Sequence, residues 1–242
     1  MQKFEEADRT AKEKGIEVIA TPNNPPSPLI VLPDEASAYL AQMDIDVEDI
    51  RYAVEAGEVA AGNITRHHPV NGAGLSRWMH VVGGVRERLA LHKTWHGENP
   101  RNRPVSAHTK LPFKLSTVGG DAATGVAEHA SGPMAARRKG VGTAEAVTQT
   151  IPLFAVEALR QPSLLSGDGS APPAGNWFLV YHRAENGVRM EVSKPAGFDP
   201  EQGQFTGWVV RVILRDWEPP AAARRPLDVG GQDVDFRIIE AS

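Results

Sequence analysis

Six of the chain's eight histidines lie between His67 and His108, and their spacing is the first pattern that could support chemistry. His92 and His96 are four residues apart in a stretch of helical periodicity, a spacing that directs two imidazoles toward one metal ion. No glutamate follows His92, so the zinc-protease motif is incomplete, and a structural role near a helix end is the alternative interpretation. We take His92, His96 and Asp121 as candidate ligands of a divalent metal.

Two further histidines, His67 and His68, precede Pro69 in an expected loop, where catalytic side chains are often presented. A metal-dependent nuclease could use one of them as a general base, together with a later histidine such as His108. Their spacing matches no nuclease motif, and solvated loop histidines are the alternative interpretation. The sequence therefore names His67, His68 and His108 as candidate catalytic residues of a metal-dependent phosphodiesterase or nuclease.

A glycine-rich segment, residues 119–125, follows an expected strand, and its backbone amides could hold a phosphate group. Its glycine spacing matches neither a Walker A loop nor a dinucleotide fingerprint, which argues against a nucleotide-hydrolysing enzyme. The chain has no Gly-x-Ser-x-Gly motif and no cysteine. Disulfides, thiolate metal sites and cysteine nucleophiles are therefore excluded, and serine-nucleophile chemistry has little support.

Charge is sorted along the chain. Residues 1–65 carry a net charge of −8, residues 66–140 carry +8, and residues 141–242 carry −4. The basic centre needs negative charge nearby, from nucleic-acid phosphate, from an acidic partner, or from the acidic N-terminal block folding back onto it. Its basic side chains are the candidate phosphate-binding or partner-binding residues: Arg77, Arg86, Arg88, Lys93, Arg101, Arg103, Lys110, Lys114, Arg137, Arg138 and Lys139.

These patterns favour a binding function over catalysis. The leading hypothesis is a non-catalytic bacterial accessory or adaptor protein, without a cofactor, whose basic centre binds the nucleic-acid phosphate backbone or an acidic protein surface. The first alternative is the metal-dependent nuclease, with a divalent metal held by His and Asp. The second is a structural subunit of a homo- or hetero-oligomer, in which blocks of opposite charge meet between protomers.

The length and composition predict one compact domain over residues 1–242, with 41% apolar residues to form its core. The expected fold is α+β, with a mostly helical N-terminal half packed on a C-terminal antiparallel β-sheet. A subdivision into a helical part, 1–110, and a β-rich part, 111–242, is an alternative. No apolar run is long enough to span a bilayer and no secretory signal is evident, so a cytoplasmic protein without membrane contact is expected.

Local patterns predict the individual elements. Helices are expected at 35–43 behind an Asp34 cap, at 47–61 behind an Asp46 cap, and at 75–96, where Gly83 and Gly84 require a close contact or a kink. Strands are expected at 29–32, 112–118 with one buried face, 177–183, 188–193, 205–215 and 234–239, and Asn186-Gly187 predicts a type I′ hairpin. The glycine-rich composition of residues 119–142 predicts a mobile loop, followed by a helix at 143–149. A helix at 2–14, a strand at 16–20 and a helical turn at 153–160 complete the prediction.

Overall fold

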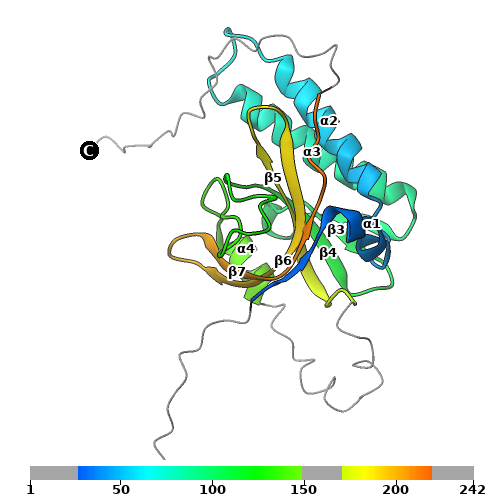
Figure 1. Cartoon of the computed structure of the whole chain (residues 1–242). Helices are drawn as coiled ribbons and strands as arrows, with labels where there is room; N and C mark the ends of the chain where they lie inside the picture. The colour runs from blue at the N-terminus through cyan, green and yellow to red at the C-terminus, as the bar shows by residue number, and fades with distance from the viewer. Residues whose placement is uncertain (1–26, 149–170, 220–242) are drawn as a thin grey trace, which may run out of the picture.

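A computed structural model describes residues 27–148 and 171–219 of the chain (Figure 1). In these ranges, four α-helices and one short 3-10 helix accompany a seven-stranded mixed sheet with the strand order β1-β7-β6-β5-β4-β3-β2. The strands are β1 (Leu29–Val31), β2 (Trp95–Glu98), β3 (Val105–His108), β4 (Phe113–Gly119), β5 (Gly175–Arg183), β6 (Val188–Asp199) and β7 (Gln204–Ile213). The helices are α1 (Pro33–Ala41), α2 (Val47–Gly62), α3 (Gly72–Leu91), the 3-10 helix η1 (Pro100–Asn102) and α4 (Val141–Thr148).

The α+β class is confirmed, but the predicted division of the chain agrees with the structure only loosely. Strands β1, β2 and β3 come from the first 110 residues, so the sheet is built from both halves. It is also mixed, because β1 runs parallel to β7 and β4 runs parallel to β5. The sequence did not reveal β2 and β3, because each has only four residues, too few for an alternating pattern to be told from chance.

The sheet lies between two layers of unequal size (Figure 1). Helices α1, α2 and α3 cover one face, where Trp177, Leu179 and Tyr181 of β5 enter the larger core. Helix α4 and the segment 120–140 lie on the other face, where Phe178 and Val180 enter a second core. Because β5 is buried on both faces, its sequence is a continuous apolar run, as expected for a central strand.

Helices α2 and α3 meet through glycine. A Cβ atom added at Gly84 would lie 2.9 Å from Cα of Ala53, and one added at Gly57 would lie 2.5 Å from a methyl group of Val81. The close contact expected at Gly84 is therefore present. Asp46 caps α2 as predicted, because its carboxylate accepts a hydrogen bond from the backbone N–H of Glu48 at 2.9 Å.

Helix α1 begins two residues earlier than its predicted cap implies. Its N-cap is Leu32, without a side-chain hydrogen bond, and Pro33 is the first helical residue, so the predicted Asp34 cap is wrong. Helix α3 also differs, since it ends at Leu91 instead of continuing to residue 96. Lys93 has a φ of 60°, and a left-handed residue at this position ends a helix.

Two predictions about strands are corrected. Strand β4 is buried on both faces, with Ser116 and Val118 inside, because α4 and the segment 120–140 cover the side that was expected to face solvent. The hairpin between β5 and β6 is confirmed, but its turn is not type I′, since neither Asn186 nor Gly187 has a positive φ.

The other predictions concern the glycine-rich segment, the helix after it and the chain outside the described residues. The glycine-rich segment is irregular, as expected of a loop, yet Gly120 bridges to Ala135 and the segment packs on the sheet. Its mobility stays a prediction. The predicted helix after it is confirmed as α4, up to the last residue described. The elements expected at 2–14, 16–20, 153–160 and 234–239 lie outside the described residues. None of the helices in the described ranges has the length and apolarity needed to cross a membrane.

Candidate anion-binding pocket

Four of the eleven basic side chains named from the sequence are paired with carboxylates. Arg77 and Arg88 of α3 are paired with residues of α2, so the acidic N-terminal block does fold back onto part of the basic centre. The four pairs are Arg77 with Glu58, Arg88 with Asp49 at 2.7 Å, Arg101 with Glu145 at 2.7 Å, and Lys114 with Glu98 at 3.3 Å.

The other seven have no carboxylate within 4.0 Å in the part of the chain that the structure describes, and they do not form one surface. Lys93 and Lys110 flank the end of the β2–β3 hairpin where the N–H of Thr109 donates to the carbonyl of Thr94. Arg103 lies at the opposite end of this hairpin, beside η1. The seven are Arg86, Lys93, Arg103, Lys110, Arg137, Arg138 and Lys139.

Arg103 and Lys139, which are far apart in the sequence, line the same cavity of about 140 Å³. The hydroxyl-bearing residues Ser116, Thr117 and Thr143 also line it. These three residues are buried and belong to β4 and α4. The cavity therefore combines two cationic groups with hydroxyl groups, and its described lining contains no carboxylate or imidazole. Such a set of side chains suits the binding of an anion.

The position of Arg103 is set by η1 and by two strands. Arg101 and Asn102 both have positive φ values, which turn the chain sharply before β3. Nη1 of Arg103 donates to the hydroxyl of Ser116 at 2.5 Å, and Nη2 donates to Oδ1 of Asn176 at 3.5 Å. Its Nε is buried without a hydrogen-bond partner among the described residues. Burial lowers the pKa of Arg103 because only neutral groups compensate for the lost hydration.

The turn between β6 and β7 holds the backbone of Lys139. Its N–H donates to the carbonyl of Gly203 at 2.9 Å, and Gly203 has a φ of 67°. The neighbouring guanidinium of Arg138 donates to the backbone carbonyls of Glu201 and Gln202, which fixes the basic run against the same turn. Burial, together with the nearby charge of Arg137, lowers the pKa of Lys139.

The histidines predicted to form a metal or catalytic site are separated. His92 caps the end of α3, and its Nε2 lies 2.5 Å from Oδ2 of Asp49. Burial alone would raise the pKa of Asp49, but its hydrogen bonds to His92 and Arg88 outweigh this effect and lower it. His96 lies in β2, where it pairs with Glu98 at 3.0 Å. The predicted pair at helical spacing is therefore wrong, because the helix ends before its second member.

His108 is held by hydrogen bonds at both ring nitrogens. Nδ1 accepts from the backbone N–H groups of Lys110 and Leu111, so Nε2 carries the proton that is donated to Oδ2 of Asp44 at 2.9 Å. Its side chain is 1% exposed. With both nitrogens engaged and no access to solvent, this imidazole stabilises the start of the β3–β4 turn.

The other predicted candidates lie in turns. His67 and His68 follow α2, and Nδ1 of His68 accepts from the N–H of Thr65 at 3.0 Å. Asp121 accepts from the N–H of Ala123 at 3.1 Å. Within residues 27–148 and 171–219, no group of three or more His, Asp or Glu side chains is arranged to hold a metal ion. A wider hollow of about 410 Å³ is lined in part by Asp44, Asp46 and His92, but its two carboxylates would repel an anion.

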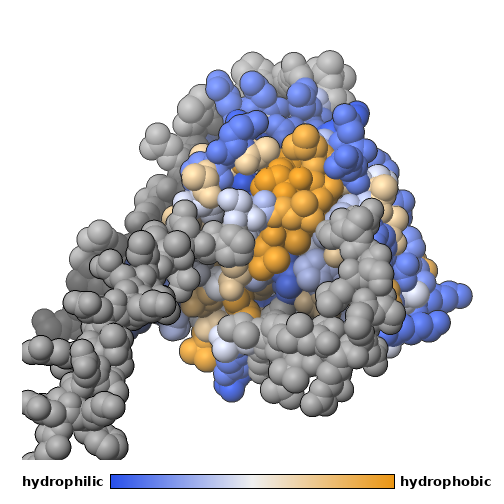
Figure 2. Space-filling model, turned by 60° about the horizontal axis from the view of Figure 1, so that its bottom comes forward, coloured by the Kyte–Doolittle hydropathy of each residue, from blue (hydrophilic) through white to orange (hydrophobic). Residues whose placement is uncertain are grey.

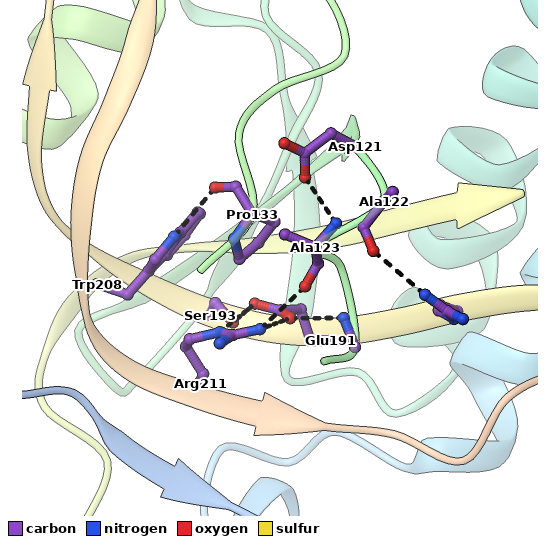
Figure 3. Close-up of polar contacts among 10 residues, drawn as sticks. Asp121, Ala122, Ala123, Pro133, Glu191, Ser193, Trp208 and Arg211 are labelled. Carbon is purple, nitrogen blue, oxygen red and sulfur yellow. Dashed lines mark hydrogen bonds and ion pairs between the residues drawn. The ribbon is translucent and has the colours of Figure 1, made fainter. Parts of the chain in front are cut away.

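A buried ion pair that the sequence did not indicate joins Arg211 of β7 to Glu191 of β6 (Figure 3). The segment 120–140 covers it, as the hydrogen bond from Arg211 to the carbonyl of Ala123 shows, so it lies on the same face of the sheet as the pocket. Nη2 and Nε of Arg211 donate to the carboxylate of Glu191 at 2.6 Å and 3.0 Å, and neither side chain is exposed. The hydroxyl of Ser193 and the N–H of Gly125 complete the hydrogen bonds to this carboxylate, at 2.7 Å and 2.9 Å. The alternation of Glu191 and Ser193 along one strand was the signal that could have indicated a polar inner face.

The rest of the surface gives less support to an anion site. On the face shown in Figure 2, hydrophobic residues form a central band, with hydrophilic residues above it and to its right. Leu29, Leu32 and Val209 are among the exposed apolar side chains of the described ranges. Apolar surface does not attract phosphate, so the pocket is the better candidate for an anion site. A scan against protein-family models, a search of curated proteins and a search of solved structures each find no match to this chain.

Proposed function

We propose that this chain is a non-catalytic binding protein that contacts the phosphate groups of a nucleic acid through a basic cluster at the pocket. The cluster consists of Arg103, Arg137, Arg138 and Lys139. The observation that carries the proposal is that these four side chains, from two separate segments, have no carboxylate partner among the described residues. Charges that the protein leaves uncompensated are available to an external anion.

Phosphate fits this cluster better than a protein carboxylate does. Guanidinium and ammonium groups bind phosphate oxygens, and serine and threonine hydroxyls commonly add contacts to the nucleic-acid backbone. Ser116, Thr117 and Thr143 supply such hydroxyls in the pocket lining. No described helix or strand carries an obvious set of base-reading side chains, so we expect little sequence specificity.

Binding without catalysis agrees with the composition of the pocket. A nuclease needs a general base or a metal ion close to the phosphate that it cleaves. The described lining of the pocket contains no histidine, aspartate or glutamate that could act as the base or hold the metal. Incubation of the full chain with labelled oligonucleotides and Mg²⁺ or Mn²⁺ should therefore leave them intact. Metal-dependent cleavage would contradict the non-catalytic part of the proposal.

The test is fluorescence anisotropy with labelled single-stranded and double-stranded DNA and RNA across a series of salt concentrations. We expect the logarithm of the affinity to fall linearly with the logarithm of the salt concentration, with a slope of roughly −2 to −4 for three or four phosphate contacts. The double variant Arg137→Gln/Arg138→Gln should weaken binding roughly tenfold at low salt.

The matched control removes the same charge from the far end of the β2–β3 hairpin. Lys93 and Lys110 are exposed, so Lys93→Gln/Lys110→Gln should leave both the fold and the affinity nearly unchanged. Thermal melting of each variant checks that it is folded. Equal losses of affinity in the two double variants would overturn the proposal and indicate binding by overall charge. Salt-sensitive binding of polyglutamate instead of nucleic acid would overturn it in favour of an acidic protein partner.

A further inference from the structure

We infer that the Arg103–Lys139 pocket binds a terminal phosphate group of a nucleic-acid strand, with its hydroxyl groups completing the contacts. This inference rests on the proposed function and adds the part of the nucleic acid that the pocket recognises. Internal phosphates would contact the exposed Arg137 and Arg138 beside the pocket.

The size of the cavity favours a single small group. Its volume of about 140 Å³ is well below the roughly 300 Å³ at which pockets for drug-sized ligands begin. One tetrahedral phosphate group fits such a space, whereas an internal phosphate carries a nucleoside on each side and needs a groove open at both ends. The terminal phosphate of a nucleic-acid strand can enter such a cavity from one side.

The charge of the pocket also favours a terminal phosphate. A phosphomonoester carries about −1.5 to −2 charge at neutral pH and has three strong acceptor oxygens. An internal phosphodiester carries a single negative charge. Two cations, Arg103 and Lys139, line the cavity, and its described lining contains no carboxylate. A dianion would therefore compensate both charges, whereas a monoanion would compensate only one.

The hydrogen-bond donors match the three oxygens. Two of the five N–H donors of Arg103 are used by Ser116 and Asn176, which leaves donors for a ligand. Because the Oγ of Ser116 accepts from Arg103, its own proton is free to be donated. Thr117 and Thr143 are 8% and 7% exposed and line the same cavity.

The aromatic lining favours a nucleotide over a phosphorylated peptide. Trp78 of α3 and Phe178 of β5 both line the cavity. Phe178 is fully buried, so only the partly exposed ring of Trp78 can meet a ligand. An aromatic side chain beside a phosphate site provides a surface for the base of the terminal nucleotide, and such stacking tolerates any base. A phosphoserine peptide has no ring at this distance from its phosphate. A preference for that peptide over the oligonucleotide would overturn the assignment of the ligand class.

The test compares the binding of one oligonucleotide sequence prepared with different terminal groups. Its 5′ end carries either a hydroxyl or a phosphate, and so does its 3′ end. We expect the wild-type protein to bind one phosphorylated end roughly tenfold more tightly than the matching hydroxyl end. In Arg103→Met and Lys139→Met this preference should disappear, while the weaker, salt-dependent binding of the hydroxyl oligonucleotide persists. Lys93→Met is the matched control and should keep the preference.

Thermal melting provides a readout that does not depend on nucleic-acid binding. Inorganic phosphate and thymidine 5′-monophosphate should raise the melting temperature of the wild type above its value in sodium chloride of equal ionic strength, and Arg103→Met should lose this rise. Equal affinity for phosphate and hydroxyl ends, with normal salt-dependent binding, would overturn this inference and leave the proposed function intact. Failure to bind any nucleic acid, with the phosphate effect on melting retained, would overturn the proposed function and the nucleic-acid ligand while leaving a phosphate pocket.

Discussion

Two arginines on the same face of the sheet differ in whether a carboxylate compensates their charge. Arg211 is fully buried and paired with Glu191 through two hydrogen bonds. Arg103 is also largely removed from water, but it contacts the neutral groups of Ser116 and Asn176. Both lie on the side covered by α4 and the segment 120–140. The protein therefore supplies a carboxylate for Arg211, whereas Arg103 has none within 4.0 Å among the described residues.

The pairing of Arg211 with Glu191 also gives the glycine-rich segment a structural role instead of the predicted phosphate-binding one. The sequence suggested that the amides of residues 119–125 could hold a phosphate. In the structure, the N–H of Gly125 donates to Glu191, and the carbonyl of Ala123 accepts from Arg211 at 3.4 Å (Figure 3). The amide of Gly125 is thus already hydrogen-bonded to the carboxylate of Glu191, which attaches the segment to the sheet. The proposed phosphate site therefore lies at Arg103, not at these amides.

The largest expected effect comes from removing the internal anion. Glu191→Gln leaves Arg211 buried without a compensating charge, and we expect it to lower the free energy of unfolding by about 3–5 kcal/mol. Urea denaturation at neutral pH measures the change. Glu185→Gln, on the exposed β5–β6 turn, is the matched control and should change the free energy of unfolding by less than about 0.5 kcal/mol. A loss below about 1 kcal/mol for Glu191→Gln would contradict a structural role for the pair.

Lys194 on β6 is buried, as Arg211 is, and it sharpens the comparison because it has neither an internal anion nor a cavity of the kind that Arg103 lines. Its Nζ is buried without a hydrogen-bond partner in the described part of the chain, and burial lowers its pKa to about 8. Lys194→Met keeps the length of the side chain and removes the charge. We expect it to raise the free energy of unfolding by about 1–3 kcal/mol at pH 7.

The pH dependence of this gain has a definite sign. The folded-state pKa of Lys194, about 8, lies below the ordinary value of 10.5, so the folded protein bears the cost of the charge fully below pH 8. Wild-type stability should therefore rise relative to Lys194→Met between about pH 8 and pH 10.5, and the two proteins should converge there. Parallel urea titrations across this range measure the effect, with Lys93→Met as the exposed control. A destabilised Lys194→Met would instead indicate that the ammonium group has a favourable partner.

The predictability of the fold depended on the length and periodicity of each element. The helix capped by Asp46 and the hairpin from residue 175 to 199 were recognisable because their patterns are long and local. The short strands β2 and β3 were not, since β2 forms only by pairing with β3 and β3 is held against β4, and four residues carry too little local pattern to show this. His96 was placed in a helix for this reason.

The predictability of the site depended on which charges are compensated. Composition located the basic centre, and Arg103 and Lys139 were both among its named residues. The sequence offered the acidic N-terminal block as one source of compensation, but a charge count could not indicate that residues of α2 pair with Arg77 and Arg88 in particular. Nor could it bring Arg103 and Lys139 together, since their convergence depends on η1 and on the β6–β7 turn.

The smallest expected effect is the one that tests the comparison most directly. Arg103→Met removes two hydrogen bonds to neutral groups and also removes the cost of a partly buried, uncompensated cation. These changes oppose each other, so the free energy of unfolding should shift by less than about 1 kcal/mol in a chloride buffer without phosphate. Arg211→Met, measured beside it by urea denaturation, leaves Glu191 buried and unpaired and should cost about 3–5 kcal/mol. If the two substitutions cost the same, Arg103 is a structural residue like Arg211, and the reason for assigning it to an external anion disappears.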